Sequence, residues 1–218
     1  RDIALVEMTS ARYHFDQITS KNSLGPLKRA KDNGTDITAG TSIHHITLNE
    51  FDIADFRTFF KVKPPLRSEE DRIAVVEALA NGLIDIVSSM HTPQDEESKR
   101  LPFEQAASGA VGLETLLPAA LRLYHDGSMD LPDLFRVLSL NPAERLGLPS
   151  GRLKVGAPAD LILFDPDLPY VLDRTKLKSK SKNTPFDGTT MQGKVLNTFV
   201  NGKEVFNNDL FSGAPRQN

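Results

Sequence analysis

Four of the five histidines in this chain lie on predicted strands or at their carboxyl ends. These four are His14, His44, His45 and His91, whereas His125 stands at the end of a predicted helix. Imidazole titrates near neutral pH and is also a common metal ligand. Because the carboxyl ends of strands in a parallel barrel converge on one mouth, the four histidines together indicate an active site there. Taken singly, each could equally well hold a loop through a hydrogen bond.

The third predicted strand ends at an unexpected residue. Its apolar stretch, from Leu83 to Val87, leads through two serines to Met90 and His91 and then into a polar loop. A strand that ends in this way usually delivers a catalytic group at its carboxyl tip. A thioether cannot accept a proton, so position 90 offers no general base.

A cationic segment follows the second predicted strand. It contains Lys61, Lys63 and Arg67 beside two prolines. A rigid loop of this kind could bind a carboxylate, with the guanidinium of Arg67 as a bidentate donor. The alternative is a solvated loop whose Ser68 caps the next helix.

The elements that would position these residues alternate between strand and helix. We predict strands over 13–19, 36–45 and 83–89, and helices over 23–34, 68–82 and 111–127. This alternation is the signature of right-handed βαβ units and a parallel sheet. The nearly continuous apolar run of the third strand indicates burial on both faces. The charged run 93–100 that follows it is typical of a solvated loop.

The pattern changes near residue 130. Helical segments over 131–139 and 141–147 precede a region of short apolar runs punctuated by Gly and Pro, as in antiparallel sheets. Asn201-Gly202 signals a hairpin between two such runs, and 207–218 has the composition of a loose tail. We therefore divide the chain into a first domain, 1–148, and a second domain, 149–218.

Composition excludes several classes of function. The 218 residues carry a formal net charge of -3, so no basic excess marks a nucleic acid or an anionic membrane as a partner. The absence of cysteine excludes disulfides and thiolate metal sites. The sequence contains neither an apolar stretch of membrane-spanning length nor a signal-peptide pattern, so we expect a cytoplasmic protein. Because the sequence starts within the helical pattern RDIALVEMTSAR, we also expect it to be part of a longer chain.

Several segments carry a resemblance to a known family. They are RYHFDQIT, IHHITLNE, KVKPPLRSEEDR, GLIDIVSSMHTPQDEESK, GAVGLETLLPAAL, LNPAERLGL, GRLKVGAPADLILFDPD, and SKNTPFDG with GKVLNTFVNGKEVF. In this order they resemble the C-terminal half of the dihydroorotases, which are cyclic-amide hydrolases of the amidohydrolase superfamily. The last of these motifs distinguishes dihydroorotases from the related hydantoinases and allantoinases.

The resemblance implies an α/β fold: a (β/α)8 TIM-type barrel with two metal ions at its mouth, and a small β-sandwich built from both chain ends. This chain would hold about the last three barrel strands and the C-terminal strands of the sandwich. The family's His-x-His pair, its bridging lysine and one further histidine belong to earlier strands. The pocket residues that remain would be His91, Lys63, Arg67, His44 and His45, with His91 at the substrate carboxylate.

The sequence departs from the family pattern at two metal-ligand positions. Ser89-Met90-His91-Thr92-Pro93 stands where the family has Ser-Asp-His-Ala-Pro, and Gln17-Ile18-Thr19-Ser20 stands where it has His-Ile-Ser-Thr. Lys63 also replaces an asparagine, and Ala107-Ser108 replaces Pro-Phe. An amide carbonyl is a poor substitute for imidazole, and a thioether is too soft for a water-activating zinc. We therefore expect no metal at Gln17 or Met90 and no cofactor in this chain. If the full-length protein is an active enzyme, we expect it to bind zinc.

Three functions remain open. The first is a dihydroorotase-family protein of pyrimidine biosynthesis that is catalytically impaired or inactive and plays a structural role with a partner such as aspartate transcarbamoylase. The second is an active dihydroorotase that interconverts carbamoyl-aspartate and dihydroorotate at an altered metal site. The third is a hydrolase of another cyclic amide. The predicted parallel sheet has an unpaired edge strand. We expect this edge to be covered by the rest of a longer chain or by a second subunit of a homo-oligomer.

Overall fold

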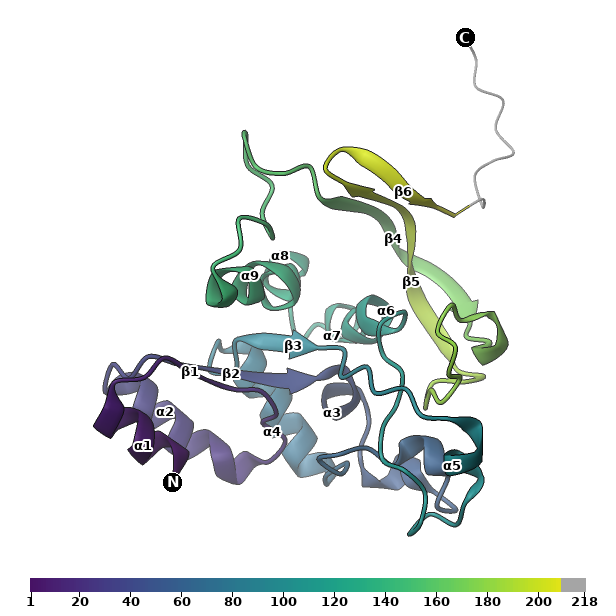
Figure 1. The fold of residues 1–218 in the computed structure, drawn as a ribbon, viewed down its shortest axis with the longest axis horizontal. Coiled ribbons are helices and arrows are strands. Elements are labelled where there is room, and N and C mark those ends of the chain that lie inside the picture. Colours follow the sequence, from purple (N-terminus) through teal and green to yellow (C-terminus); the bar gives the residue numbers. More distant parts are fainter. Residues whose placement is uncertain (209–218) are drawn as a thin grey trace.

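The computed structural model describes residues 1–208, which form two three-stranded sheets (Figure 1). The first sheet contains β1 (Tyr13–Phe15), β2 (Ile37–Ser42) and β3 (Ile86–Ser88), in that order. Both strand pairs are parallel. The predicted arrangement of three neighbouring parallel strands is therefore confirmed, and their carboxyl ends lie on one side of the sheet.

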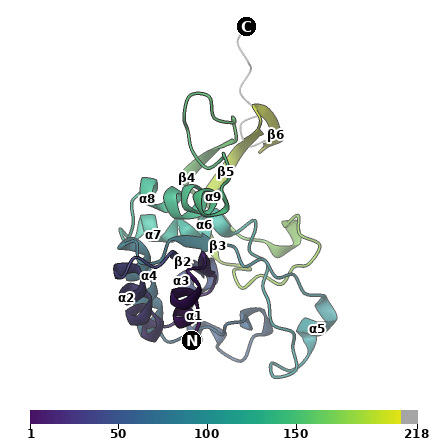
Figure 2. The same cartoon turned by 60° about the vertical axis from the view of Figure 1, so that its left-hand side comes forward.

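Helical segments connect and cover these strands. In chain order they are α1 (Asp2–Thr9), α2 (Leu24–Asp32), α3 (Ile43–Thr47), α4 (Glu69–Ala80), α5 (Glu96–Arg100), α6 (Leu116–Ala120), α7 (Arg122–His125), α8 (Leu131–Phe135) and α9 (Asn141–Leu146). A π-helical turn, η4 (Arg136–Leu140), joins α8 to α9, so the two helical segments predicted there form one run. In both views α1 and α2 lie below the strands, and α8 and α9 lie above them (Figures 1 and 2).

Helix α4 begins and ends where its local sequence predicts. The Ser68 hydroxyl accepts a hydrogen bond from the Asp71 backbone N–H (3.2 Å), which makes Ser68 the N-cap. Val75 and Leu79, one helical turn apart, are buried against the core. Gly82, with a φ of 72°, takes the left-handed conformation that often terminates a helix.

The strands are shorter than predicted. β1 and β3 each keep three residues. The strand predicted over 36–45 stops at Ser42, and the chain then turns into α3, which buries Ile43 in the core. His44 and His45 therefore lie on a short helix that follows the strand rather than on the strand itself.

The helix predicted over 111–127 is interrupted, and only its second half is helical, as α6 and α7. The N–H of Val111 donates to the Asn183 carbonyl (3.1 Å), and the N–H of Gly112 donates to Nδ1 of His91 (3.2 Å). Bonds to distant segments thus replace the first turns of the predicted helix.

The second sheet is antiparallel. It contains β4 (Leu161–Val171), β5 (Thr190–Val200) and β6 (Lys203–Asn207), in that order. Asn201 and Gly202 have φ values of 49° and 74°, the positive pair that a two-residue type I′ hairpin requires, so the predicted hairpin is confirmed. The predicted tail over 207–218 lies almost entirely outside the described residues.

A hydrophobic core joins the two parts of the chain. Its buried members include Ile43, Leu79 and Leu121 from the first part and Leu172, Phe186 and Met191 from the second. The second part therefore helps to position the residues around the first sheet. No helix within residues 1–208 combines the length and the apolar character needed to cross a membrane.

Candidate functional site

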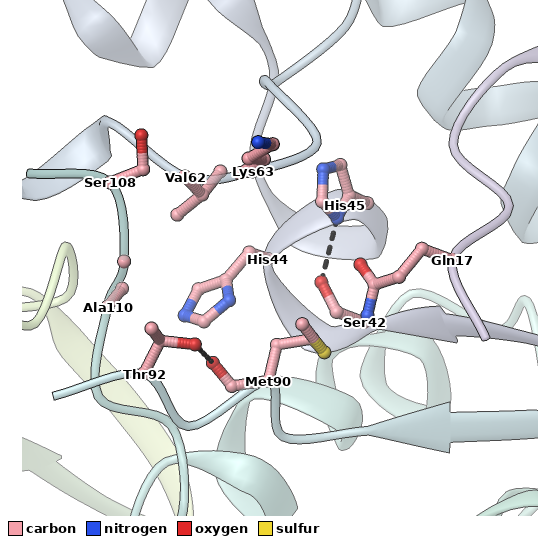
Figure 3. Close-up of a pocket in the computed structure, with 11 residues that line it drawn as sticks. Gln17, Ser42, His44, His45, Val62, Lys63, Met90, Thr92, Ser108 and Ala110 are labelled. Atoms are coloured by element: carbon pink, nitrogen blue, oxygen red, sulfur yellow. Dashed lines mark hydrogen bonds between the residues drawn. The ribbon is translucent and has the colours of Figure 1, made fainter.

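A small cavity of about 40 Å³ lies beyond the carboxyl ends of the parallel strands (Figure 3). The residues around it are Gln17, Ser42, His44, His45, Val62, Lys63, Met90, Thr92, Ser108, Gly109 and Ala110. Pockets that enclose a whole small-molecule ligand usually measure several hundred Å³. The cavity is therefore too small to enclose such a ligand by itself.

Gln17 and Met90, the two residues for which the resemblance implies metal-ligand positions, both face this cavity. Gln17 follows β1, and its buried Oε1 atom has no hydrogen-bond partner among the described residues. Met90 follows β3 with a φ of 42°, in the left-handed region that side chains with a Cβ rarely adopt. Figure 3 shows the two side chains approaching from different loop segments, one after β1 and one after β3. The sequence prediction that they share one site is consistent with this geometry.

His44 is almost completely buried, with 1% of its surface exposed. Its ring stacks on Phe186 with a centroid distance of 6.0 Å, and its Nε2 atom has no hydrogen-bond partner within residues 1–208. Burial, with a smaller contribution from His45, lowers the pKa of His44 to about 3. His44 is therefore neutral at pH 7.

His45 uses both ring nitrogens to hold the cavity wall. Its Nε2 lies 3.0 Å from the Pro64 carbonyl, and its Nδ1 lies 2.8 Å from the Ser42 hydroxyl. Because a carbonyl only accepts, Nε2 carries the proton, and Nδ1 accepts from the hydroxyl. Burial lowers the pKa of this imidazole as well. His45 therefore fixes the segment that carries Lys63.

The three cationic side chains of the segment 61–67 make different contacts. Lys63 lines the cavity and is exposed. Lys61 instead donates from Nζ to the carbonyls of Phe103 (2.7 Å) and Glu104 (2.8 Å). Arg67 donates from Nε to the Thr19 hydroxyl (3.3 Å) and does not line the cavity.

The other three histidines lie outside the cavity lining. Nδ1 of His91 accepts from the backbone N–H groups of Gly112 (3.2 Å) and Leu113 (3.4 Å), so in this structure it holds a loop. His14 lies on β1, with Nδ1 2.8 Å from the Thr38 hydroxyl. His125 ends α7, with Nε2 3.5 Å from Oδ1 of Asp167 on β4.

Asn183, which the residue-by-residue reading did not single out, supports the cavity wall from the second part of the chain. It is 2% exposed. Its Nδ2 donates to the carbonyls of Gly109 (3.1 Å) and Thr92 (3.3 Å), and its Oδ1 accepts from the Gln94 N–H (3.3 Å). The only signal for it was the family motif SKNTPFDG, which gave no role for the side chain.

Acid is expected to destabilise the fold through His44. Its pKa lies near 3 in the folded chain and near 6.5 when unfolded, so its contribution to stability is complete above pH 6.5 and is lost as pH falls toward 3. By pH 4 this loss amounts to about 3 kcal/mol. Urea unfolding of the full-length protein at pH 7 and pH 4 measures it. His44→Gln should flatten this pH dependence. An unchanged slope in His44→Gln would contradict the assignment.

Comparison with known proteins identifies the family. The family model described as "Amidohydrolase family" matches residues 18–205. The chain belongs to the amidohydrolase family. Within it, the resemblance to dihydroorotases is confirmed: the chain is 44% identical over 207 residues to a dihydroorotase of Ehrlichia canis, covering 94% of this chain and 46% of that protein. A dihydroorotase of Desulforapulum autotrophicum is 39% identical over 210 residues, with coverages of 96% and 49%.

Solved structures of the family share the fold of this amidohydrolase chain. L-hydantoinase from Arthrobacter aurescens superposes with a TM-score of 0.90 at 30% identity, covering 94% of this chain and 47% of that one. A D-hydantoinase gives a TM-score of 0.85 at 26% identity with the same coverages. The chain thus spans about half the length of the relatives it matches.

The described part of the cavity lining does not by itself offer zinc a complete set of ligands. Within residues 1–208 no three or more His, Cys, Asp or Glu side chains gather where they could hold a metal. The side chains at the two family ligand positions supply an amide oxygen and a thioether sulfur. Zinc that activates water takes imidazole nitrogens and carboxylate oxygens instead.

Proposed function

We propose that the full-length protein is a dihydroorotase homologue of pyrimidine biosynthesis that binds an anionic ligand without hydrolysing it. The observation that carries this proposal is the presence of Met90 and Gln17 in the cavity. Hydrolysis of a cyclic amide needs an activated water and a group that takes its proton. Neither side chain can accept that proton.

Retention of anion binding is supported by the two cations of the pocket loop. Lys63 lines the cavity, and Arg67 lies four residues further along the same loop. Within residues 1–208 neither side chain has a carboxylate oxygen within 4.0 Å of its nitrogens. The Lys63 ammonium is therefore available to a carboxylate ligand such as dihydroorotate or carbamoyl-aspartate, whereas Arg67, outside the lining, adds only a nearby positive charge.

The role that follows is structural. We propose that the protein binds aspartate transcarbamoylase, in the cytoplasm, and that ligand occupancy stabilises this assembly. The partner is inferred from the resemblance to dihydroorotases. Sedimentation of the full-length protein mixed with aspartate transcarbamoylase tests it, and independent sedimentation at micromolar concentrations of both proteins would contradict it.

A specific observation favours a second function, an active dihydroorotase with an altered zinc site. Gln17 Oε1 and His44 Nε2 are buried polar atoms without partners in the described part of the chain. Buried polar atoms are normally satisfied by protein, water or an ion. A metal ligated in part by residues outside this chain could satisfy them.

Turnover separates the two functions. We expect purified full-length protein to show no dihydroorotate hydrolysis above background, with or without added zinc and with or without aspartate transcarbamoylase. Calorimetry should still detect dihydroorotate binding. Clear turnover that His91→Ala abolishes would establish the active enzyme instead, and zinc retained through dialysis would show that its metal site is present.

A further inference from the structure

Lys99 is a buried lysine in the charged run where the sequence predicts a solvated loop, so for this residue the prediction is wrong. It lies in α5 and is 3% exposed. Its Nζ donates to three backbone carbonyls, those of Ala107 (2.8 Å), Thr58 (2.9 Å) and Lys61 (3.4 Å). An ammonium group has three N–H donors, so all of them are used.

These carbonyls lie in two separate segments, 58–63 and 107–110, each of which contributes residues to a wall of the cavity. Thr58 and Lys61 precede Val62 and Lys63, and Ala107 precedes the lining residues 108–110. Lys99 therefore lies at the junction of the two walls, although it does not face the cavity.

Further bonds close the same junction. The Gly109 N–H donates to the Lys61 carbonyl (2.8 Å), and the Ala107 N–H donates to the Ser98 carbonyl (3.2 Å). The Thr58 hydroxyl donates to the carbonyl of Lys99 itself (2.5 Å). Each of these further bonds joins one donor to one acceptor. The Lys99 Nζ atom, in contrast, bonds to both walls at once.

The ammonium has no acidic partner. Within residues 1–208 no carboxylate oxygen lies within 4.0 Å of Lys99 Nζ. Burial, with a smaller contribution from the nearby charge of Lys61, lowers its pKa to about 8, so the group is still mainly protonated at pH 7. Carbonyl dipoles alone compensate the charge, and hydrogen bonds from a charged donor are stronger than those from a neutral one.

We propose that Lys99 is the positioning residue of the cavity: its ammonium fixes the wall 107–110 against the segment 58–63 and so sets the position of Lys63. The part of this inference that concerns a bound anion rests on the proposed function. The part that concerns the wall rests on the contacts of Lys99 alone.

Two readouts on the full-length protein test the proposal. Hydrogen exchange measures the protection of backbone amides in peptides that cover 103–110, which shows whether this wall is ordered. Amide protection in the hairpin of β5 and β6 serves as an internal reference. Calorimetry with dihydroorotate reports the position of Lys63. Lys99→Met keeps the length of the side chain and removes its charge. The matched control is Arg100→Met, the neighbouring residue of α5, whose side chain is 71% exposed.

We expect Lys99→Met to lower protection in 103–110 by about tenfold or more and to weaken dihydroorotate binding by a similar factor. Protection of the hairpin should not change, and Arg100→Met should change neither readout by more than about twofold. Unchanged wall protection in Lys99→Met would overturn the proposal. Loss of protection throughout the chain would overturn it too, because Lys99 would then be a general stabilising residue.

Restoring the charge distinguishes positioning from packing. This chain has no cysteine, so Lys99→Cys can be alkylated in denaturant with bromoethylamine, which returns an ammonium at the length of lysine, or with bromoethane, which does not. Wild-type protein treated in the same way controls for cysteines elsewhere. Only the aminoethylated protein should regain wall protection. If wild-type protein shows an ordered wall but no dihydroorotate binding, the proposed function fails while the assignment of Lys99 stands.

Discussion

Met90→Asp alone is expected to leave the full-length protein inactive, and Gln17→His with Met90→Asp is expected to restore zinc binding before it restores turnover. Both side chains face the same cavity, so both must change for these two positions to supply the imidazole and the carboxylate that the family pattern has there. Loss of a proton-transferring group typically lowers a rate by about 10²–10⁴. Because residues that act as a unit have non-additive effects, repair of one of them should not recover a matching part of the rate.

The backbone at position 90 favours this experiment. Its φ of 42° is in the left-handed region, which aspartate adopts more readily than methionine does. Met90→Asp should therefore fold without new strain, and Met90→Leu provides a control that changes the side chain without adding a ligand. The measurements are zinc content after dialysis and hydrolysis of dihydroorotate. Turnover by Met90→Asp alone would show that a metal site already exists and that only the base is missing.

Gly112→Ala is expected to produce the largest loss of stability of any single change considered. A Cβ at this position would lie 2.0 Å from the Ser89 carbonyl oxygen and 3.0 Å from its carbon. Backbone cannot rotate away as a side chain can, so the contact must separate the segment after β3 from the 110–112 segment. Overpacking of this kind typically destabilises a protein by 1–3 kcal/mol and occasionally more, and we expect about 3 kcal/mol or more here.

Gly25→Ala is the matched control. Gly25 lies in α2, where the nearest atom to an added Cβ is the Arg29 guanidinium nitrogen, at 3.6 Å. Because Gly25 lies in the first turn of α2 and precedes Pro26, which disfavours a Cβ on the helical residue before it, the usual gain from a helical alanine is offset. The change should therefore alter stability by no more than about 1 kcal/mol. Urea unfolding of both variants at pH 7 measures the difference. A loss of less than about 1 kcal/mol in Gly112→Ala would mean that the loop does not pack on the strand tip as described.

The order of the parallel strands, the N-cap Ser68 and the hairpin turn at Asn201-Gly202 could all be predicted from the sequence. Each depends on periodicity or on neighbouring residues, which a local pattern records. Gln17 and Met90 could be assigned to one site through the resemblance to dihydroorotases, and both face the cavity.

The features that escaped prediction depend on contacts between distant segments. His91 turns toward Gly112, and Lys99 is buried by carbonyls from 38 and 41 residues earlier in the chain. The charge pattern around Lys99 is that of an exposed loop, since nothing local shows that backbone carbonyls will surround it. The first half of the predicted helix 111–127 was lost to such contacts as well.

Asn183 has a consequence for recombining this chain with its relatives. It reaches from the second part of the chain to the Gly109 and Thr92 carbonyls, beside the cavity that the first part otherwise builds. A chimera joined near residue 148 would therefore take the parallel strands and most of the cavity from one parent, and the Asn183 side chain that supports the cavity wall from the other. Residues 92–94 and 109–111 would have to be exchanged together with 183, because these are the positions that its side chain and carbonyl bridge. A chimera should therefore exchange segments that are hydrogen-bonded to one another, rather than one contiguous domain.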